Sequence, residues 1–174
     1  MCPEKRPDLA IEIAAQSGLP LKIAAKIDKA DQEYFKTEIE PLLSQAHVEF
    51  LEEISEQQKP GFLSGAKALL FPIDWSEPFG LVMIEAMACG TPVIAFNRGS
   101  VPEVIDHGVT GYICEDAQDA IGALGRLDDL SRTEIRAQFE RRFTATTMAQ
   151  KYIESYTSLL RAARRPVLRR ATAG

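Results

Sequence analysis

Two short runs of apolar residues in the middle of the chain constrain its fold more than any other feature. Residues 68–71 and 92–96 are continuously apolar, and between them residues 79–89 form an apolar stretch long enough for a helix, which ends at Gly90. Strands that are buried on both faces have this continuous pattern, whereas strands with one solvent-facing side alternate apolar and polar residues. The alternation of such runs with helices predicts an α/β fold, a parallel sheet with helices on both faces.

The remaining elements follow from hydrophobic spacing and from helix boundary signals. Residues 29–44 repeat apolar side chains at helical intervals, and residues 55–66 form a weaker helix because Pro60 and Gly61 interrupt it. Further helices are predicted at residues 7–17, 101–105, 116–127, 131–143 and 146–164, further strands at residues 47–51 and 111–114, and a short apolar run at residues 21–25. Helices therefore dominate the C-terminal segment.

Composition is that of an ordinary folded domain. The 174 residues are 45% hydrophobic and 26% charged, which fits one core and excludes a disordered chain or a disulfide scaffold. The formal net charge is −5 although residues 161–174 hold five arginines and no acid, so the acidic body is not expected to bind nucleic acid. The apolar runs are too short to cross a bilayer, and the first residues do not form a secretory signal. We expect a cytoplasmic protein whose three cysteines are reduced thiols.

Glu85 is an unusual residue for its surroundings. It is the one charge between Glu77 and Arg98, in a helix whose other side chains are small or apolar. A carboxylate seldom lies in such a place without a partner. The alternative is a surface position on a half-buried helix, and the residues alone leave both interpretations open.

Glu77 lies at the turn that leads into the same helix. This turn follows a predicted strand, and ligands of open parallel sheets bind at the carboxyl ends of the strands. The main-chain amides of Phe79, Gly80 and Leu81 would point toward an anion there, so the turn is predicted to seat a phosphate. If the whole interval from Glu77 to Glu85 is helical, the two residues are about 12 Å apart along the helix axis, which is comparable to the span of a nucleotide-sugar. An acid at a helix start, favoured by the helix dipole, is the alternative.

The segment that begins at Glu77 resembles a known family. Its stretches EPFGLVMIE, AMACGTPVIAFNRGSVPEVI and DHGVTGYIC resemble the E-x7-E signature and its sequel in family 4 (group 1) retaining glycosyltransferases of the GT-B fold. The N-terminal letters PEK are similar to the family's phosphate-binding loop. The resemblance implies that residues 1–160 are the Rossmann-like, C-terminal donor-binding domain of such an enzyme, truncated at its N-terminus, and that residues 161–174 are an Arg-rich tail.

The resemblance assigns roles to particular residues. Glu77 would contact hydroxyl groups of the donor sugar, and Lys5 would neutralise the diphosphate as its bond to the sugar breaks. Glu85 would bind the ribose hydroxyls, and Ile54 lies in the region similar to the base-binding loop, where Glu52 replaces an expected glycine. Backbone groups of three further residues would hold the sugar and the distal phosphate: Phe79, Gly80 and Leu81. The family generally needs no metal ion and no cofactor, since the nucleotide-sugar is the donor substrate.

Other motifs are interpreted as structural. Ser100 with Glu103 resembles the family's G-G-x-P-E turn, but it also matches a helix capping box, which we favour. Ser131 with Glu134 has the same capping pattern, and Thr146 is predicted to begin the last helix. These positions are therefore expected to fix helix starts.

The resemblance also implies parts that are absent from this sequence. In the family a hydrophobic strand and a Gly-Arg pair precede the phosphate-binding loop, and that strand is the first of a sheet with strand order 3-2-1-4-5-6. Without it, both neighbouring strands have an exposed edge, so we expect a gap, an altered strand order, or pairing with another chain, including a homo-oligomer. The expected partners are a nucleotide-sugar and either a missing N-terminal acceptor domain or a second chain.

Two functions fit these observations. The first is the donor-binding half of a retaining glycosyltransferase, which transfers a sugar from a nucleotide-sugar to an acceptor held by the other half. The second is a non-catalytic nucleotide-sugar-binding or interaction module derived from such an enzyme. The sequence identifies neither the base, the donor sugar nor the acceptor.

Overall fold

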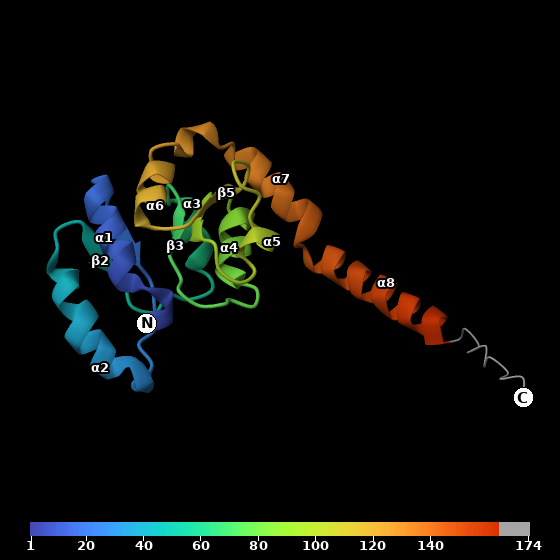
Figure 1. Cartoon of the computed structure of the whole chain (residues 1–174), viewed down its shortest axis with the longest axis horizontal. Coiled ribbons are helices and arrows are strands. Elements are labelled where there is room, and N and C mark those ends of the chain that lie inside the picture. Colours follow the sequence, from blue (N-terminus) through green and yellow to red (C-terminus); the bar gives the residue numbers. More distant parts are fainter. Residues whose placement is uncertain (164–174) are drawn as a thin grey trace, which may run out of the picture. The chain divides into compact units, whose positions relative to one another are not determined.

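The strands form two separate parallel sheets in the computed structural model, which describes residues 1–163 (Figure 1). Strand β1 (Leu21–Ile23) pairs with β2 (Val48–Phe50). In the second sheet, β4 (Val93–Phe96) lies between β3 (Leu69–Phe71) and β5 (Gly111–Cys114). The predicted α/β fold with parallel strands is confirmed. Of the three outcomes expected from a missing first strand, the described part of the chain has the gap, which separates β1 from β3.

Two pairs of helices cover the sheets. Helix α1 (Pro7–Ser17) packs beside α6 (Ala117–Leu124), as Figure 1 shows, and because α1 contacts β1 while α6 contacts β4 and β5, this pair connects the two sheets. Helix α3 (Lys59–Ser64) packs against α4 (Leu81–Ala88), which contacts β4. The other helical segments are η1 (Pro3–Lys5), η2 (Lys29–Asp31), α2 (Gln32–Tyr34), η3 (Phe35–Ile39), η4 (Glu40–Ser44), α5 (Val101–Val104), η5 (Leu127–Asp129), α7 (Arg132–Arg142) and α8 (Ala145–Ala163).

The regular helix predicted at residues 29–44 is wrong. This segment is a series of short turns in which 3₁₀, α and π geometries follow one another. Pro41 lies in the first turn of η4, where its missing N–H breaks the regular bonding pattern. The apolar spacing still produces packing, since Ile39 is fully buried and the Phe35 ring lies 5.8 Å from the Phe50 ring of β2.

Two other helices begin later than predicted. Helix α3 begins at Lys59, so Pro60 lies in its first turn, where proline is tolerated because its missing N–H would have no partner in the helix. Helix α4 begins at Leu81 and not at residue 79, because Gly80 has a φ of +73°, which is outside the range of a right-handed helix.

The predicted helix caps have mixed outcomes. Ser131 Oγ accepts a hydrogen bond from the Glu134 N–H at 3.3 Å, as predicted. Thr144, and not Thr146, caps the start of α8, because its Oγ1 accepts from the Thr147 N–H at 3.1 Å. The capping role predicted for Ser100 is wrong: its Oγ is buried and makes no hydrogen bond with any described residue.

Strand β4 is the centre of the core. Its first three side chains are fully buried and Phe96 is 6% exposed. Next to it, Thr91 Oγ1 donates to the Leu63 carbonyl at 2.7 Å and accepts from the Arg132 guanidinium at 2.9 Å. These bonds connect β4, α3 and the start of α7.

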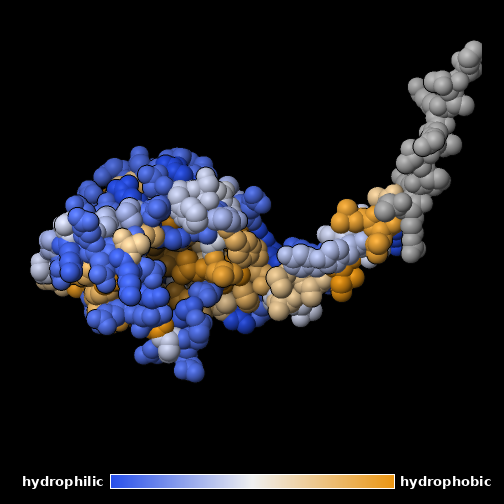
Figure 2. Space-filling view, turned by 90° about the horizontal axis from the view of Figure 1, so that it is seen from below, coloured by the Kyte–Doolittle hydropathy of each residue, from blue (hydrophilic) through white to orange (hydrophobic). Residues whose placement is uncertain are grey.

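The chain divides into two units, Met1–Phe139 and Glu140–Gly174. In the described part of the second unit, α8 has exposed apolar side chains at helical spacing, which Figure 2 shows as hydrophobic surface on the long helix. They are Met148, Tyr152, Ile153, Tyr156, Leu159 and Leu160. None of the helices within residues 1–163 has the length and apolar character that a membrane span requires. Most of the predicted Arg-rich tail, from residue 164, lies outside the described residues.

Candidate functional site

An ion pair connects the N-terminal segment to the turn before α4. Lys5 Nζ lies 2.6 Å from Glu77 Oε2, and the Glu77 side chain is 13% exposed. The ammonium group also lies 5.0 Å from the centroid of the Trp75 ring and 5.6 Å from that of Phe71, within the range of cation–π attraction. Two residues that are 72 positions apart in sequence are thus held in direct contact.

The Glu77 carboxylate is held in its ionised form. Burial by itself would raise its pKa, but the hydrogen bond and positive charge of Lys5 outweigh burial, and the amides of Gly80 and Phe79 act in the same direction. The pKa of Glu77 is therefore lowered. The Gly80 N–H donates to Glu77 Oε1 at 3.2 Å. Glu77 thus remains an acceptor of hydrogen bonds at neutral pH.

The turn after β4 supports the main chain of Glu77. The Ser100 N–H donates to the Glu77 carbonyl at 2.9 Å. Gly99 has a φ of +54°, and a Cβ at this position would lie 2.4 Å from the same carbonyl oxygen. Glycine is required here both by its backbone conformation and by the close approach of two main-chain segments. The capping pattern of Ser100 and Glu103 in the sequence gives no sign of this contact with Glu77.

A groove of about 320 Å³ lies beside this ion pair. Three of the residues predicted for the donor site, Lys5, Ile54 and Glu85, line it. Lys59, which the sequence analysis did not single out, lines it too, and its Nζ lies 3.3 Å from Glu85 Oε1. Lys59 also pairs with Glu56 at 2.8 Å. This i,i+3 spacing was the one feature of the sequence that could have indicated an ion pair at Lys59.

Some predicted site residues lie away from the groove wall. Phe79, Gly80 and Leu81 are not among the residues that line it, and the Phe79 and Leu81 side chains are 41% and 64% exposed. Glu77 is connected to the groove through Lys5. The premise of the predicted 12 Å separation between Glu77 and Glu85 is wrong, because α4 begins at Leu81. The Gly80 amide, expected to face an anion, instead contacts the Glu77 carboxylate.

The loop predicted to hold the base has a distinctive backbone. Glu52, which stands where the family pattern has glycine, has a φ of +55°, a conformation that glycine adopts without strain. The Ala25 N–H donates to the Glu52 carbonyl at 2.9 Å and holds the loop against the end of β1. Ile54 follows two residues later and lines the groove. Among residues 1–163, His, Cys, Asp and Glu side chains do not gather in a group of three that could hold a metal ion.

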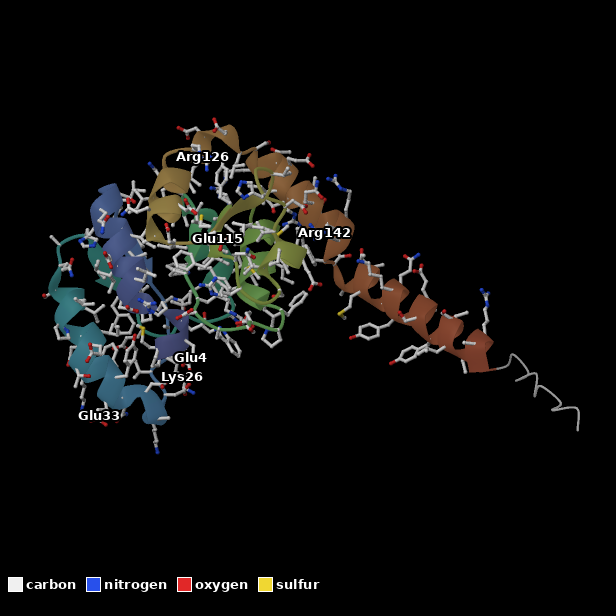
Figure 3. All side chains as sticks on the ribbon, viewed as in Figure 1. Glu4, Lys26, Glu33, Glu115, Arg126 and Arg142 are labelled. Atoms are coloured by element: carbon white, nitrogen blue, oxygen red, sulfur yellow. The ribbon has the colours of Figure 1, made fainter. Side chains whose placement is uncertain are left out.

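The N-terminal segment crosses the same end of the groove. The Met1 ammonium donates to the Lys26 carbonyl at 2.5 Å, and the Asp74 N–H donates to the Glu4 carbonyl at 2.9 Å. Figure 3 labels Glu4 and Lys26, which lie near each other at this end of the main body. This segment positions Lys5.

Comparisons with known proteins identify the family of this chain. The family model described as "Glycosyl transferases group 1" matches residues 1–145. N-acetyl-alpha-D-glucosaminyl L-malate synthase of Bacillus anthracis is 45% identical over 62 residues, which are 36% of this chain and 16% of that enzyme. Alpha-1,3/1,6-mannosyltransferase ALG2 of Homo sapiens is 34% identical over 121 residues, which are 66% of this chain and 29% of that enzyme.

A solved structure shows the same fold. Anabaena Alr3699/HepE in complex with UDP and glucose superposes with a TM-score of 0.76 at 23% identity, over 91% of this chain and 46% of that one. The chain thus spans less than half of each of these three relatives. The family model covers most of the chain, including both residues of the Lys5–Glu77 pair. The chain is therefore a member of the group 1 glycosyl transferase family.

Proposed function

We propose that this chain is the donor-binding half of a retaining family 4 glycosyltransferase, which transfers a sugar from a nucleotide-sugar to an acceptor. The observation that carries the proposal is the Lys5–Glu77 pair beside a groove that also contains Glu85. An ammonium group paired with one carboxylate, beside a groove that a second carboxylate lines, suits a ligand with an anionic centre and hydroxyl groups on either side. A nucleotide-sugar has this pattern: ribose hydroxyls, a diphosphate and sugar hydroxyls.

Each residue has a role in this proposal. Lys5 Nζ contacts the diphosphate, and Glu77, whose pKa is lowered by Lys5 and by neighbouring amides against the opposing effect of burial, accepts hydrogen bonds from sugar hydroxyls. Glu85 accepts from the ribose hydroxyls, and Ile54 packs against the base. Main-chain groups of three residues hold the sugar and the distal phosphate: Phe79, Gly80 and Leu81. In this proposal the Gly80 amide exchanges its contact with Glu77 for one with the donor.

The reaction breaks the bond between the anomeric carbon of the sugar and a phosphate oxygen. Negative charge grows on the departing diphosphate, and the ammonium group of Lys5 stabilises it. The acceptor hydroxyl then attacks from the face that the phosphate leaves and gives its proton to an oxygen of the departing phosphate, so the configuration at the anomeric carbon is retained. This course needs no basic side chain from this half of the enzyme.

The relatives support this choice of ligand class. Both curated relatives are named for sugar transfer or synthesis of a glycosyl compound, and HepE was solved with UDP and glucose. Because the chain spans less than half of each relative, the proposal places acceptor binding outside this chain. Binding of donor without transfer is then the expected behaviour of the chain by itself.

Isothermal titration calorimetry with UDP-glucose, GDP-mannose and ADP-glucose tests the donor site. Lys5→Ala should weaken binding of the preferred donor by about 10- to 100-fold, the range for a lost charge-assisted hydrogen bond. Lys36→Ala is the matched control, because Lys36 is an exposed lysine on η3 that does not line the groove. Glu85→Gln should weaken donor binding, because the carboxylate that accepts hydrogen bonds from the ribose hydroxyls is lost. Glu49→Gln is the matched control and should leave donor binding unchanged, because Glu49 is exposed.

A turnover assay distinguishes the two candidate functions. Sugar transfer by this chain together with the remainder of a family member supports the glycosyltransferase. Donor binding that never leads to transfer, even in such a mixture, supports the non-catalytic module. If none of the nucleotide-sugars binds, or if Lys5→Ala and Lys36→Ala behave alike, the proposed site is rejected.

A further inference from the structure

The Glu85 carboxylate is held from outside its own helix. A helical side chain can reach the residues three and four positions away, and for Glu85 these are Leu81, Val82, Ala88 and Cys89, none of them charged. Within residues 1–163, the polar partner of Glu85 is Lys59 at the start of α3, whose Nζ donates to Oε1 at 3.3 Å. The second carboxylate oxygen, Oε2, accepts no hydrogen bond from these residues.

Lys59 lies where the loop proposed to hold the base joins α3. It is the first residue of α3, and its N–H donates at 3.2 Å to the carbonyl of Ser55, which follows Ile54. Helix α3 packs against α4, and the Lys59 and Glu85 side chains both line the groove. The ammonium group also lies 2.8 Å from Glu56 Oε1 in the same loop. Lys59 therefore connects this loop to the carboxylate on α4.

The two contacts of the Lys59 ammonium group differ in their exposure to water. The Glu56 side chain is 84% exposed, and ion pairs at such positions contribute little because water and salt screen them. The Glu85 side chain is 36% exposed and that of Lys59 33%. Hydrogen bonds to Glu56 and Glu85 raise the pKa of Lys59, so its side chain stays positively charged at neutral pH.

This positive charge also compensates for Glu85 beside an anionic ligand. The diphosphate of a nucleotide-sugar is repelled by a carboxylate on the groove wall. A lysine paired with that carboxylate cancels most of the repulsion, while the oxygen that the lysine leaves free can still accept hydrogen bonds from hydroxyl groups. The geometry at Glu85 thus suits a neutral, hydroxyl-bearing part of the donor.

We propose that Lys59 is a positioning residue of the donor site, which binds one oxygen of the Glu85 carboxylate and directs the other toward the ribose hydroxyls. The inference rests on the proposed function. It makes Lys59 a determinant of the preference for donors that carry ribose hydroxyls. Without Lys59, the long Glu85 side chain must be ordered by the donor itself, which weakens that contact.

Calorimetric titration with two donors tests this role. One is whichever of UDP-glucose, GDP-mannose and ADP-glucose binds most tightly, and the other is the same compound with 2′,3′-dideoxyribose. The chain should prefer the ribose donor by about 10- to 100-fold, the range for lost charge-assisted hydrogen bonds. Lys59→Met should reduce this preference by about 2- to 13-fold, the cost of ordering one flexible side chain. Lys59→Ala gives the same comparison if the methionine variant fails to fold.

Lys22→Met is the matched control. Lys22 also lines the groove, but its Nζ pairs with Glu49 at 2.8 Å and not with Glu85. Any general effect of a lost positive charge should weaken both donors alike, so the preference should stay at the value of the unmodified chain. Glu85→Gln should remove most of the preference, and Lys59→Met added to Glu85→Gln should reduce it no further, because Lys59 acts through Glu85.

The outcomes separate this role from the donor site itself. If the chain binds none of the nucleotide-sugars, the proposed function fails and the role of Lys59 fails with it. If the donor binds and Lys5→Ala weakens it, three results overturn the role of Lys59 alone. They are an unchanged preference in Lys59→Met, an equal loss of preference in Lys22→Met, and a further loss when Lys59→Met is combined with Glu85→Gln.

Discussion

Replacement of Gly99 by alanine tests whether the turn after β4 positions Glu77. The added Cβ would lie 2.4 Å from the carbonyl oxygen of Glu77 and 2.5 Å from its amide nitrogen, closer than such atoms approach in proteins. Both neighbours are main-chain atoms, so the contact cannot be relieved by rotation of a side chain. The turn and the Glu77 backbone must separate, which moves the carboxylate away from Lys5.

The magnitude follows from two contributions. A left-handed conformation costs an alanine about 1–2 kcal/mol, and the reduced freedom of the unfolded chain returns about 0.4–1 kcal/mol of this. Overpacking against the Glu77 backbone adds about 1–3 kcal/mol. Gly99→Ala should therefore lower the free energy of unfolding by about 1–4.6 kcal/mol, or the melting temperature by about 2–18 °C.

Gly108→Ala is the matched control. Gly108 also has a positive φ, +78°, but a Cβ there would meet no atom within 4 Å. The same replacement should thus cost about 1.6 kcal/mol or less, the conformational part alone. Urea unfolding followed by circular dichroism gives both values, and titration with the preferred nucleotide-sugar shows whether Gly99→Ala also weakens donor binding while Gly108→Ala does not.

Equal effects of the two replacements would refute this reasoning. In that case the cost would come from the backbone conformation alone, and the turn would not support Glu77. A large loss of stability with unchanged donor affinity would confirm the close contact at Gly99 but show that Glu77 does not bind the donor.

Three further predictions concern single buried groups. Thr91→Val should lower the free energy of unfolding by about 1–3 kcal/mol in urea titrations, because the Leu63 carbonyl loses its buried donor at 2.7 Å; Thr91→Ser, which keeps the hydroxyl, should recover most of this. Burial would raise the pKa of Glu77, but Lys5 and backbone amides outweigh it, so this pKa is lowered from an ordinary value of 4.5. The stabilising contribution of the carboxylate is therefore present above pH 4.5 and is lost as pH falls through the lower folded-state pKa. Glu77→Gln should reduce the dependence of the free energy of unfolding on pH in this acid range, and an unchanged dependence contradicts the assignment. Cys114 is 2% exposed and burial raises the pKa of its thiol to about 11, so a disulfide reagent at pH 8 should modify it only after unfolding; its modification in the folded chain at the rate of a free thiol contradicts this.

The strands could be predicted from the sequence because their patterns are local. Continuous apolar runs at residues 68–71 and 92–96 indicate burial on both faces, and β3 and β4 lie within them. The gap between β1 and β3 could also be expected, but from the resemblance and not from any local pattern. Residues 29–44 show what apolar spacing cannot predict. The spacing indicates which face packs, but it does not determine whether each turn is α, 3₁₀ or π.

Contacts of the candidate site could be predicted in kind but not in detail. Lys5 and Glu77 were both predicted, but their direct ion pair joins residues 72 positions apart, and nothing in the spacing indicates it. Lys59 was missed for the same reason, since its partner Glu85 lies 26 positions later. Gly80 was predicted to face a phosphate because its helix was expected to begin two residues earlier. Each difference arises where tertiary packing decides the geometry.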